Sequence, residues 1–178
     1  MKLILLSREE MARTLERLAS EIVERHGEDM DRLLLVGIQR RGGDLARRLT
    51  RVLKEKCGRD IPLGTLDINL YRDDWTSLAA FPSLGASSIP LPLEGRKVLL
   101  VDDVLYTGRT VRAALEAILD YGRPACVELL VLVDRGHREL PIQADYVGRS
   151  VRTSRAETVD VLLEERDDRD EVCLVSNR

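Results

Sequence analysis

The stretch Val-Leu-Leu-Val-Asp-Asp-Val-Leu-Tyr-Thr-Gly-Arg-Thr, residues 98–110, decides the fold class of this chain of 178 residues. It begins with four apolar residues, Val98–Val101, which is the pattern of a strand buried on both faces of a parallel sheet. Two carboxylates, Asp102 and Asp103, follow, and a turn at Thr107-Gly108 leads into a segment with helical apolar periodicity. The order strand, turn and helix predicts a βα unit of an α/β protein.

Segments on both sides of this unit also alternate between predicted strands and predicted helices. Ser7-Arg8-Glu9-Glu10 has the form of a capping box and predicts a first helix that runs to about His26, where Gly27 ends it. Further patterns predict strands at 33–38, 63–70 and 127–133, helices at 44–57 and 110–121, and a final hairpin of 159–165 with 171–175. We therefore expect one α/β domain, residues 1–178, with a twisted parallel sheet flanked by helices.

Composition excludes several classes of protein. The formal net charge of −3 gives no global reason to expect a nucleic-acid partner. Three widely spaced cysteines, Cys57, Cys126 and Cys173, argue against a disulfide framework or a zinc site. The apolar run Leu3–Leu6 is too short for a signal peptide, and no segment reaches the length of a membrane span. We expect a cytoplasmic protein with reduced thiols and no membrane partner.

The 98–110 segment also predicts a site for a phosphorylated sugar. A helix N-terminus presents unpaired N–H groups and partial positive charge, while Gly108 permits close approach and the hydroxyls of Thr107 and Thr110 add donors for a phosphate. Asp102 and Asp103 are acceptors, so their partners are ribose hydroxyls or hydrated Mg²⁺. The competing interpretation is an ordinary strand–turn–helix with a capping threonine and a solvated acid pair. Thr-Gly-x-Thr alone favours that interpretation, and the whole run favours the sugar phosphate.

Two other segments bear on the site. Val36–Gly42 ends a strand and opens a helix, so its amides are placed to hold a second anion. Tyr71–Pro92 shows neither the apolar periodicity of a helix nor that of a strand. It is also longer than an ordinary connection, which is typical of a functional lid or of disorder. Trp75 and Phe81 within it either fold onto the site or rest against a neighbouring subunit.

Residues 98–110 resemble the binding motif for phosphoribosyl diphosphate (PRPP) of the type I phosphoribosyltransferases. Together with Leu66–Asp74 and Val133–Ile142, they make nearly the whole chain similar to the bacterial pyrimidine operon regulators, which are also uracil phosphoribosyltransferases. The resemblance implies a small hood beside the sheet and a homodimer or higher homo-oligomer. It also implies conversion of uracil and PRPP to UMP and diphosphate, with Mg²⁺ held through PRPP and water near Asp102 and Asp103 and not by direct protein ligands.

The resemblance assigns roles to particular residues. Catalytic roles fall to Asp102, Asp103 and Arg41. Binding of PRPP or UMP is implied for Arg40, Arg41, Gly42, Val104, Leu105, Tyr106, Thr107, Gly108, Arg109 and Thr110. Tyr71–Pro92 becomes a flap over PRPP with Arg72, Asp73 and Asp74 at its base, and Arg135 becomes a candidate for contact with the base or nucleotide. Arg40 departs from the family, in which threonine is usual.

A second implied activity is binding of a leader-RNA hairpin in the presence of UMP or UTP, which controls transcription attenuation. Candidate contacts are Arg17, His137, Arg138, Arg149, Arg152 and Arg155. Glu16, Ser20 and Gln143 depart from the family's usual threonine, histidine and arginine, and Glu16 would repel phosphate. Two alternatives stay open: a purine-type or other phosphoribosyltransferase, because base contacts include backbone groups, and a UMP-sensing RNA regulator with vestigial catalysis.

Overall fold

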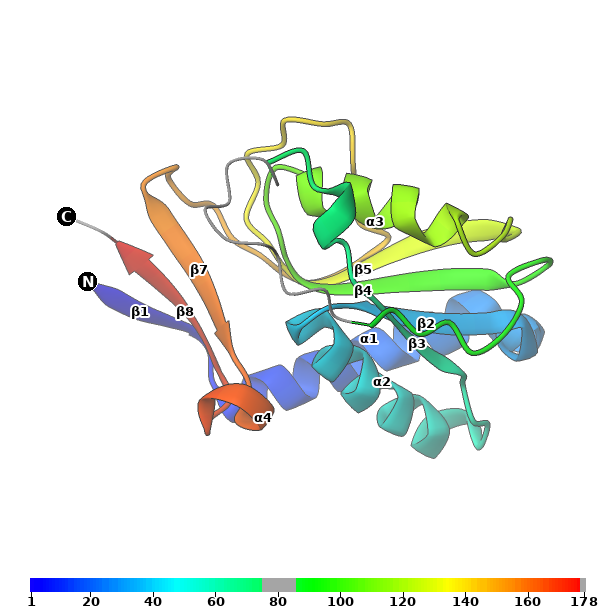
Figure 1. Ribbon diagram of the computed structural model, residues 1–178. Coiled ribbons are helices and arrows are strands. Elements are labelled where there is room, and N and C mark those ends of the chain that lie inside the picture. The colour runs from blue at the N-terminus through cyan, green and yellow to red at the C-terminus, as the bar shows by residue number, and fades with distance from the viewer. Residues whose placement is uncertain (75–85, 177–178) are drawn as a thin grey trace.

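A five-stranded parallel sheet forms the centre of the computed structural model, which describes residues 1–74 and 86–176 (Figure 1). The strand order is β3-β2-β4-β5-β6. The strands are β2 (Leu33–Ile38), β3 (Leu63–Leu66), β4 (Lys97–Leu105), β5 (Cys126–Asp134) and β6 (Tyr146–Ser150). All four neighbouring pairs are parallel, and β2 is buried along its whole length. The parallel α/β fold expected from the sequence is confirmed.

Helices cover both faces of this sheet (Figure 1). α1 (Arg8–His26) and α2 (Arg41–Cys57) pack together on one face, and α3 (Arg109–Leu119) lies on the other. The capping box of α1 is confirmed, because Ser7 Oγ accepts from the Glu10 amide and Glu10 Oε2 accepts from the Ser7 amide at 2.8 Å. A 3₁₀ helix, η1 (Gly27–Arg32), follows α1.

A second, antiparallel sheet stands at the carboxyl end of the parallel strands (Figure 1). Its strand order is β1-β8-β7, and we call this sheet together with the short helix α4 the hood. Its elements are β1 (Lys2–Leu6), β7 (Glu157–Leu162), α4 (Glu164–Asp167) and β8 (Glu171–Ser176). The predicted hairpin of β7 and β8 is confirmed, with α4 inserted in its connection.

Several predicted boundaries were wrong. The strand expected at 63–70 ends at Leu66, and Asn69–Tyr71 forms the 3₁₀ helix η2. β4 continues to Leu105, so Asp102 and Asp103 lie inside the strand and not beyond it. The sequence did not predict β1 or β6. β1 is a strand because it pairs with β8 from the other end of the chain, which no local pattern reveals.

The topology places a crevice between β2 and β4. The chain leaves β2 through α2 to β3 on one side, whereas β4, the neighbour on the other side, leads into α3 on the opposite face. In open α/β sheets such a switch point, outside the carboxyl ends of the strands, is where ligands bind. The first turn of α2 approaches β4 closely: a Cβ on Gly42 would lie 2.3 Å from the Val101 carbonyl oxygen.

Cys57, Cys126 and Cys173 are free thiols. Within residues 1–74 and 86–176, no helix combines the length and the apolar character needed to cross a membrane.

Candidate active site

The turn between β4 and α3 forms the floor of a cavity of about 410 Å³. Gly108 is the N-cap of α3 with φ 92°, a left-handed conformation that favours glycine. The Thr107 hydroxyl accepts from the Arg109 amide at 3.3 Å, which leaves other N–H groups of the first turn for a ligand. The cavity is lined by Arg72, Asp73, Asp74, Val104, Leu105, Tyr106, Thr107, Gly108, Arg109, Thr110 and Val111. The structure thus brings together the residues expected to cradle a sugar phosphate and those at the base of the flap.

Arg109 joins the flap base to the loop after β5. Its Nη1 donates to Asp73 Oδ2 at 2.5 Å and its Nε to Glu139 Oε2 at 2.8 Å. The carboxylates of Glu139 and Asp73 raise the pKa of Arg109. Arg72 forms its own ion pair with Asp74 at 2.7 Å. Trp75 and Phe81, which were expected either to fold onto the site or to rest against a neighbouring subunit, lie outside the described residues.

The two adjacent carboxylates of β4 lie in different surroundings. Asp102 is 6% exposed, and its Oδ1 accepts from the Asp103 amide at 2.9 Å. Burial, with a further contribution from the negative charge of Asp103, raises the pKa of Asp102 well above its usual range. Asp103 accepts from the Val104 amide at 2.8 Å and borders a second cavity of about 360 Å³ with Arg41, Val159, Asp160, Val161 and Leu162. Sequence analysis assigned the two acids a shared role, but of the two only Asp103 lines either the cavity at the β4–α3 turn or the cavity beside β7.

The loop after β2 carries the second predicted anion site. The Gln39–Arg40 peptide is cis, and α2 begins at Arg41. Arg40 is exposed, whereas Arg41 donates through Nη2 to both carboxylate oxygens of Asp167 in α4, at 3.1 and 3.2 Å. Arg41 and Asp103, from the adjacent strand ends of β2 and β4, therefore border the same cavity.

Arg135 is buried and makes contacts within the protein. Its guanidinium donates to Thr153 Oγ1 at 3.2 Å and to two backbone carbonyls, and its Cζ lies 4.1 Å from the centroid of the Tyr106 ring. Arg138 donates to the Tyr106 carbonyl at 2.8 Å and to Asp134 at 2.5 Å. These two arginines both contact Tyr106, a residue that lines the first cavity, and the nucleotide contact expected from Arg135 stays a prediction.

The RNA candidates fall into three sets. Arg17 of α1 donates to the Gly148 carbonyl at 2.5 Å, and Arg149 of β6 donates to the Leu5 carbonyl, which places both where α1 meets β6. His137 contacts the Thr153 carbonyl at 2.6 Å, beside Arg138. Arg152 and Arg155 are exposed. Of the departures from the family, Glu16 forms an ion pair with Lys56 at 2.8 Å, and Ser20 and Gln143 are exposed.

Three residues near the cavities escaped sequence reasoning. They are Arg112, Glu139 and Asp167. Arg112 donates to the Tyr71 carbonyl and Glu139 accepts from Arg109, contacts that join segments distant in sequence. Only Asp167 left a local signal, because it lies in the charged run 164–171 between two apolar strands.

Known proteins share both the sequence and the fold. A sequence model of the phosphoribosyl transferase domain family matches residues 3–166. The chain is 52% identical over 167 residues to the bifunctional protein PyrR of Elusimicrobium minutum, covering 94% of this chain and 93% of that protein. It is 53% identical over 168 residues to the bifunctional protein PyrR of Thermus thermophilus, covering 94% and 92%. A hypoxanthine phosphoribosyltransferase structure from Trypanosoma cruzi has the same fold, with a TM-score of 0.73 at 19% identity over 98% of this chain and 97% of that one.

Proposed function

The chain belongs to the phosphoribosyltransferase family and, within it, to the bifunctional PyrR proteins, and from this membership we propose that it converts uracil and PRPP to UMP and diphosphate and regulates pyrimidine genes. The observation that carries the catalytic half is the meeting of two helix N-termini, those of α2 and α3, at the adjacent carboxyl ends of β2 and β4. Two anion sites at one switch point fit a substrate that carries a phosphate at one end and a diphosphate at the other.

The 5-phosphate of PRPP binds at the turn 106–110. The N–H groups at the start of α3 and the hydroxyls of Thr107 and Thr110 supply donors, and Arg109 adds positive charge. Gly108 keeps this turn free of a side chain. The flap base at Arg72, Asp73 and Asp74 borders the same cavity and therefore lies beside the bound sugar phosphate.

The diphosphate binds at residues 39–42. Arg41 faces the cavity that Asp103 also borders, and Arg40 extends the positive charge of the loop. Asp103 accepts from a ribose hydroxyl or from water bound to Mg²⁺. When bound, Mg²⁺ neutralises diphosphate charge. Among the described residues no cluster of three His, Cys, Asp or Glu side chains is placed to hold a metal.

Catalysis by this site consists of positioning and charge stabilisation. The base nitrogen replaces diphosphate at C1 of the ribose, and the developing negative charge on the diphosphate is met by Arg41 and the first amides of α2. Uracil occupies the cavity of about 360 Å³ between Asp103 and β7, where backbone groups of Val159–Leu162 are available to its polar edge. The protein acts as a cytoplasmic homodimer or higher homo-oligomer.

Steady-state turnover with Mg²⁺, PRPP and one base at a time tests the enzyme. We expect UMP from uracil, and little or no product from hypoxanthine, guanine or orotate. Product from a purine in preference to uracil would identify a purine-type enzyme. Failure with all four bases, while UMP is still bound, would favour a nucleotide-sensing regulator with vestigial catalysis.

The regulatory half is proposed from the high identity to the bifunctional relatives, and its RNA ligand is the leader hairpin of pyrimidine genes. Such a complex needs cationic contacts to the RNA. They are provided by Arg17 and Arg149 at α1 and β6, and by the exposed Arg152 and Arg155. A gel-shift experiment with this RNA, with and without UMP, tests it: a UMP-dependent shift at low salt is expected. No shift in either condition would remove the RNA role and leave the enzyme.

A further inference from the structure

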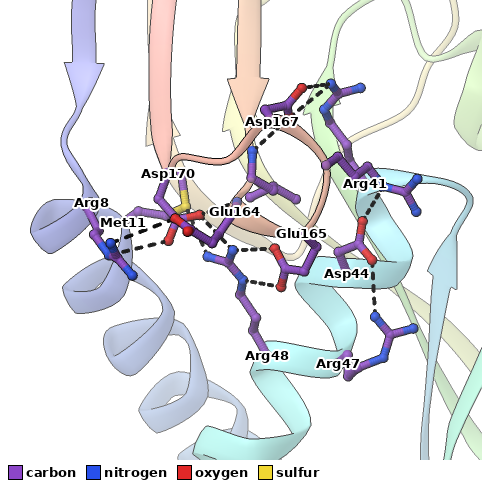
Figure 2. A network of polar contacts seen from close by, with 12 residues as sticks. Arg8, Met11, Arg41, Asp44, Arg47, Arg48, Glu164, Glu165, Asp167 and Asp170 are labelled. Carbon is purple, nitrogen blue, oxygen red and sulfur yellow. Dashed lines mark hydrogen bonds and ion pairs between the residues drawn. The ribbon is translucent and has the colours of Figure 1, made fainter.

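Helix α4 of the hood and the turn that follows it, at Asp170, are joined to α2 by arginine–carboxylate contacts (Figure 2). The pairs are Arg41–Asp167, Arg48–Glu165, Arg48–Asp170 and Arg166–Asp44. Among the residues of this network, Arg41 differs from the others because it also borders the cavity with Asp103. The contact between Arg41 and Asp167 therefore bears on ligand binding as well as on attachment of the hood.

The geometry of this contact leaves most of the Arg41 guanidinium available. Both oxygens of Asp167 accept from the same nitrogen, Nη2, at 3.1 and 3.2 Å. Arginine carries five N–H donors in a planar fork. The Arg41 Nε is buried and has no hydrogen-bond partner within the part of the chain that the structure describes. Asp167 thus holds Arg41 by one nitrogen and leaves other donors for an anion.

Asp167 is itself fixed without the help of Arg41. Its Oδ2 accepts from the Leu163 amide at 2.9 Å, and its own amide donates to the Leu163 carbonyl at 2.7 Å. The hydrogen bond from the Leu163 amide, and then the positive charge of Arg41, lower the pKa of Asp167. A rigid, ionised carboxylate therefore faces a long and otherwise mobile side chain.

We propose that Asp167 is a positioning residue for PRPP binding: it holds the guanidinium of Arg41 beside the cavity shared with Asp103 before the diphosphate arrives. The inference rests on the proposed function and names a further residue of the same site. Ordering a long side chain during binding lowers affinity, so an arginine that is ordered beforehand binds its anion more tightly. The negative charge of Asp167 opposes diphosphate, but its contact with a single nitrogen does not occupy the arginine fork.

Asp167→Asn isolates this contact. Asparagine keeps an oxygen that accepts from the Leu163 amide, and it removes the charge and the second acceptor that face Arg41. We expect KM for PRPP and Kd for Mg²⁺–PRPP, measured by calorimetry, to rise about three- to tenfold because Arg41 must be ordered on binding. Both kcat at saturating PRPP and KM for uracil should stay within about twofold, since no other contact of the reacting groups changes.

Glu165→Gln is the matched control. Glu165 lies on the same helix and pairs with Arg48 through both carboxylate oxygens, but no hydrogen bond or ion pair joins it to Arg41 among the described residues. The affinity of E165Q for PRPP should stay within about twofold of that of the parent protein. A loss of affinity equal to that of D167N would mean that the network only attaches the hood to α2. In an Arg41→Gln background, D167N should have no further effect on PRPP affinity, because the two residues act through one contact.

The outcomes separate this inference from the proposed function. A parent protein that binds no PRPP refutes the proposed function and the positioning role with it. PRPP binding by the parent with unchanged or tighter binding by D167N refutes the positioning role alone, and tighter binding would show that Asp167 competes with the diphosphate. If D167N does not fold, Asp167→Ser, which retains an acceptor for the Leu163 amide, is measured against the same expectations.

Discussion

Asp102 and Asp103 are consecutive on β4, and the amide of Asp103 donates to the buried carboxyl of Asp102 at 2.9 Å while the Asp103 carboxylate borders a cavity. Adjacent side chains of a strand point to opposite sides, so one acid lies within the protein and the other reaches solvent and ligand. Two residues that look equivalent in the sequence therefore lie in different surroundings, one buried and one beside a cavity.

Asp103→Asn should lower kcat/KM for PRPP by at least about tenfold, a loss of about 1.4 kcal/mol of transition-state stabilisation. The variant keeps the size of the side chain and removes the charge that faces ribose and hydrated Mg²⁺. Steady-state kinetics with uracil measure the effect, and Asp60→Asn, whose side chain is 82% exposed, is the control. Unchanged kinetics would show that Asp103 does not contact the substrate.

Asp102→Asn should change stability in a pH-dependent way. The raised pKa of Asp102 means that the folded protein keeps a proton that the unfolded chain releases above about pH 4, so wild-type stability falls as pH rises from there to the folded pKa. Asparagine does not titrate and escapes this loss. We expect its Tm to exceed that of the wild type by at least about 2 °C at neutral pH, and the difference to shrink toward about pH 4.

Thermal unfolding followed by circular dichroism across this pH range checks the prediction. A stability difference that is constant with pH would show that Asp102 ionises normally in the folded protein. Asparagine keeps an oxygen that accepts from the Asp103 amide, so D102N should leave this hydrogen bond in place.

Gly42→Ala should destabilise the protein by about 2 kcal/mol or more and weaken PRPP binding, because the new methyl group would lie 2.3 Å from the Val101 carbonyl oxygen and would push α2 away from β4. Gly43→Ala is the neighbouring control, since its methyl would meet Thr65 Cγ2 at an ordinary 3.8 Å. Denaturant unfolding of both variants measures the difference. Equal stabilities would contradict the close approach of α2 to β4.

Asp73→Asn should loosen the base of the flap. It removes one carboxylate from Arg109 and leaves the contact of Arg109 with Glu139. Because exposed ion pairs contribute little, we expect only about a two- to fivefold rise in KM for PRPP, with faster amide hydrogen exchange at residues 71–74. Glu139→Gln removes the other contact and should leave exchange at 71–74 unchanged. Identical exchange in D73N and the parent would argue against a role of Arg109 in holding the flap.

Sequence reasoning located the turn between β4 and α3 because its signal is local. The apolar run Val98–Val101, the acids and the Gly108 turn are contiguous, so strand, turn and helix can be read from neighbouring residues. The same reasoning found the loop at Arg41-Gly42, although the reason for the glycine, its approach to Val101, appeared only in the structure.

Tertiary contacts account for what the sequence did not reveal. β1 depends on pairing with β8, and β6 is a short, partly exposed edge strand of the parallel sheet. The burial of Arg135 also depends on tertiary contacts, because its partners Thr153 and Tyr106 lie in other segments. The charged run that contains Asp167 is visible in the sequence, but its pairing with Arg41, 126 positions away, is a tertiary contact that no local pattern reveals.

The pairing of β1 with β8 has a consequence for the order of folding on the ribosome. The amino group of Met1 donates to the carbonyl of Ser176, 175 positions away, whereas the parallel sheet is complete once β6, residues 146–150, has been made. Domains form from the N-terminal side as the chain emerges, and contacts distant in sequence form late. A nascent chain can therefore complete the parallel sheet before it has a hood, and β1, with the buried Leu5 and Leu6, has no partner strand until β8 has been made. During that interval β1 is an unpaired strand with apolar side chains, which is the kind of segment that favours aggregation.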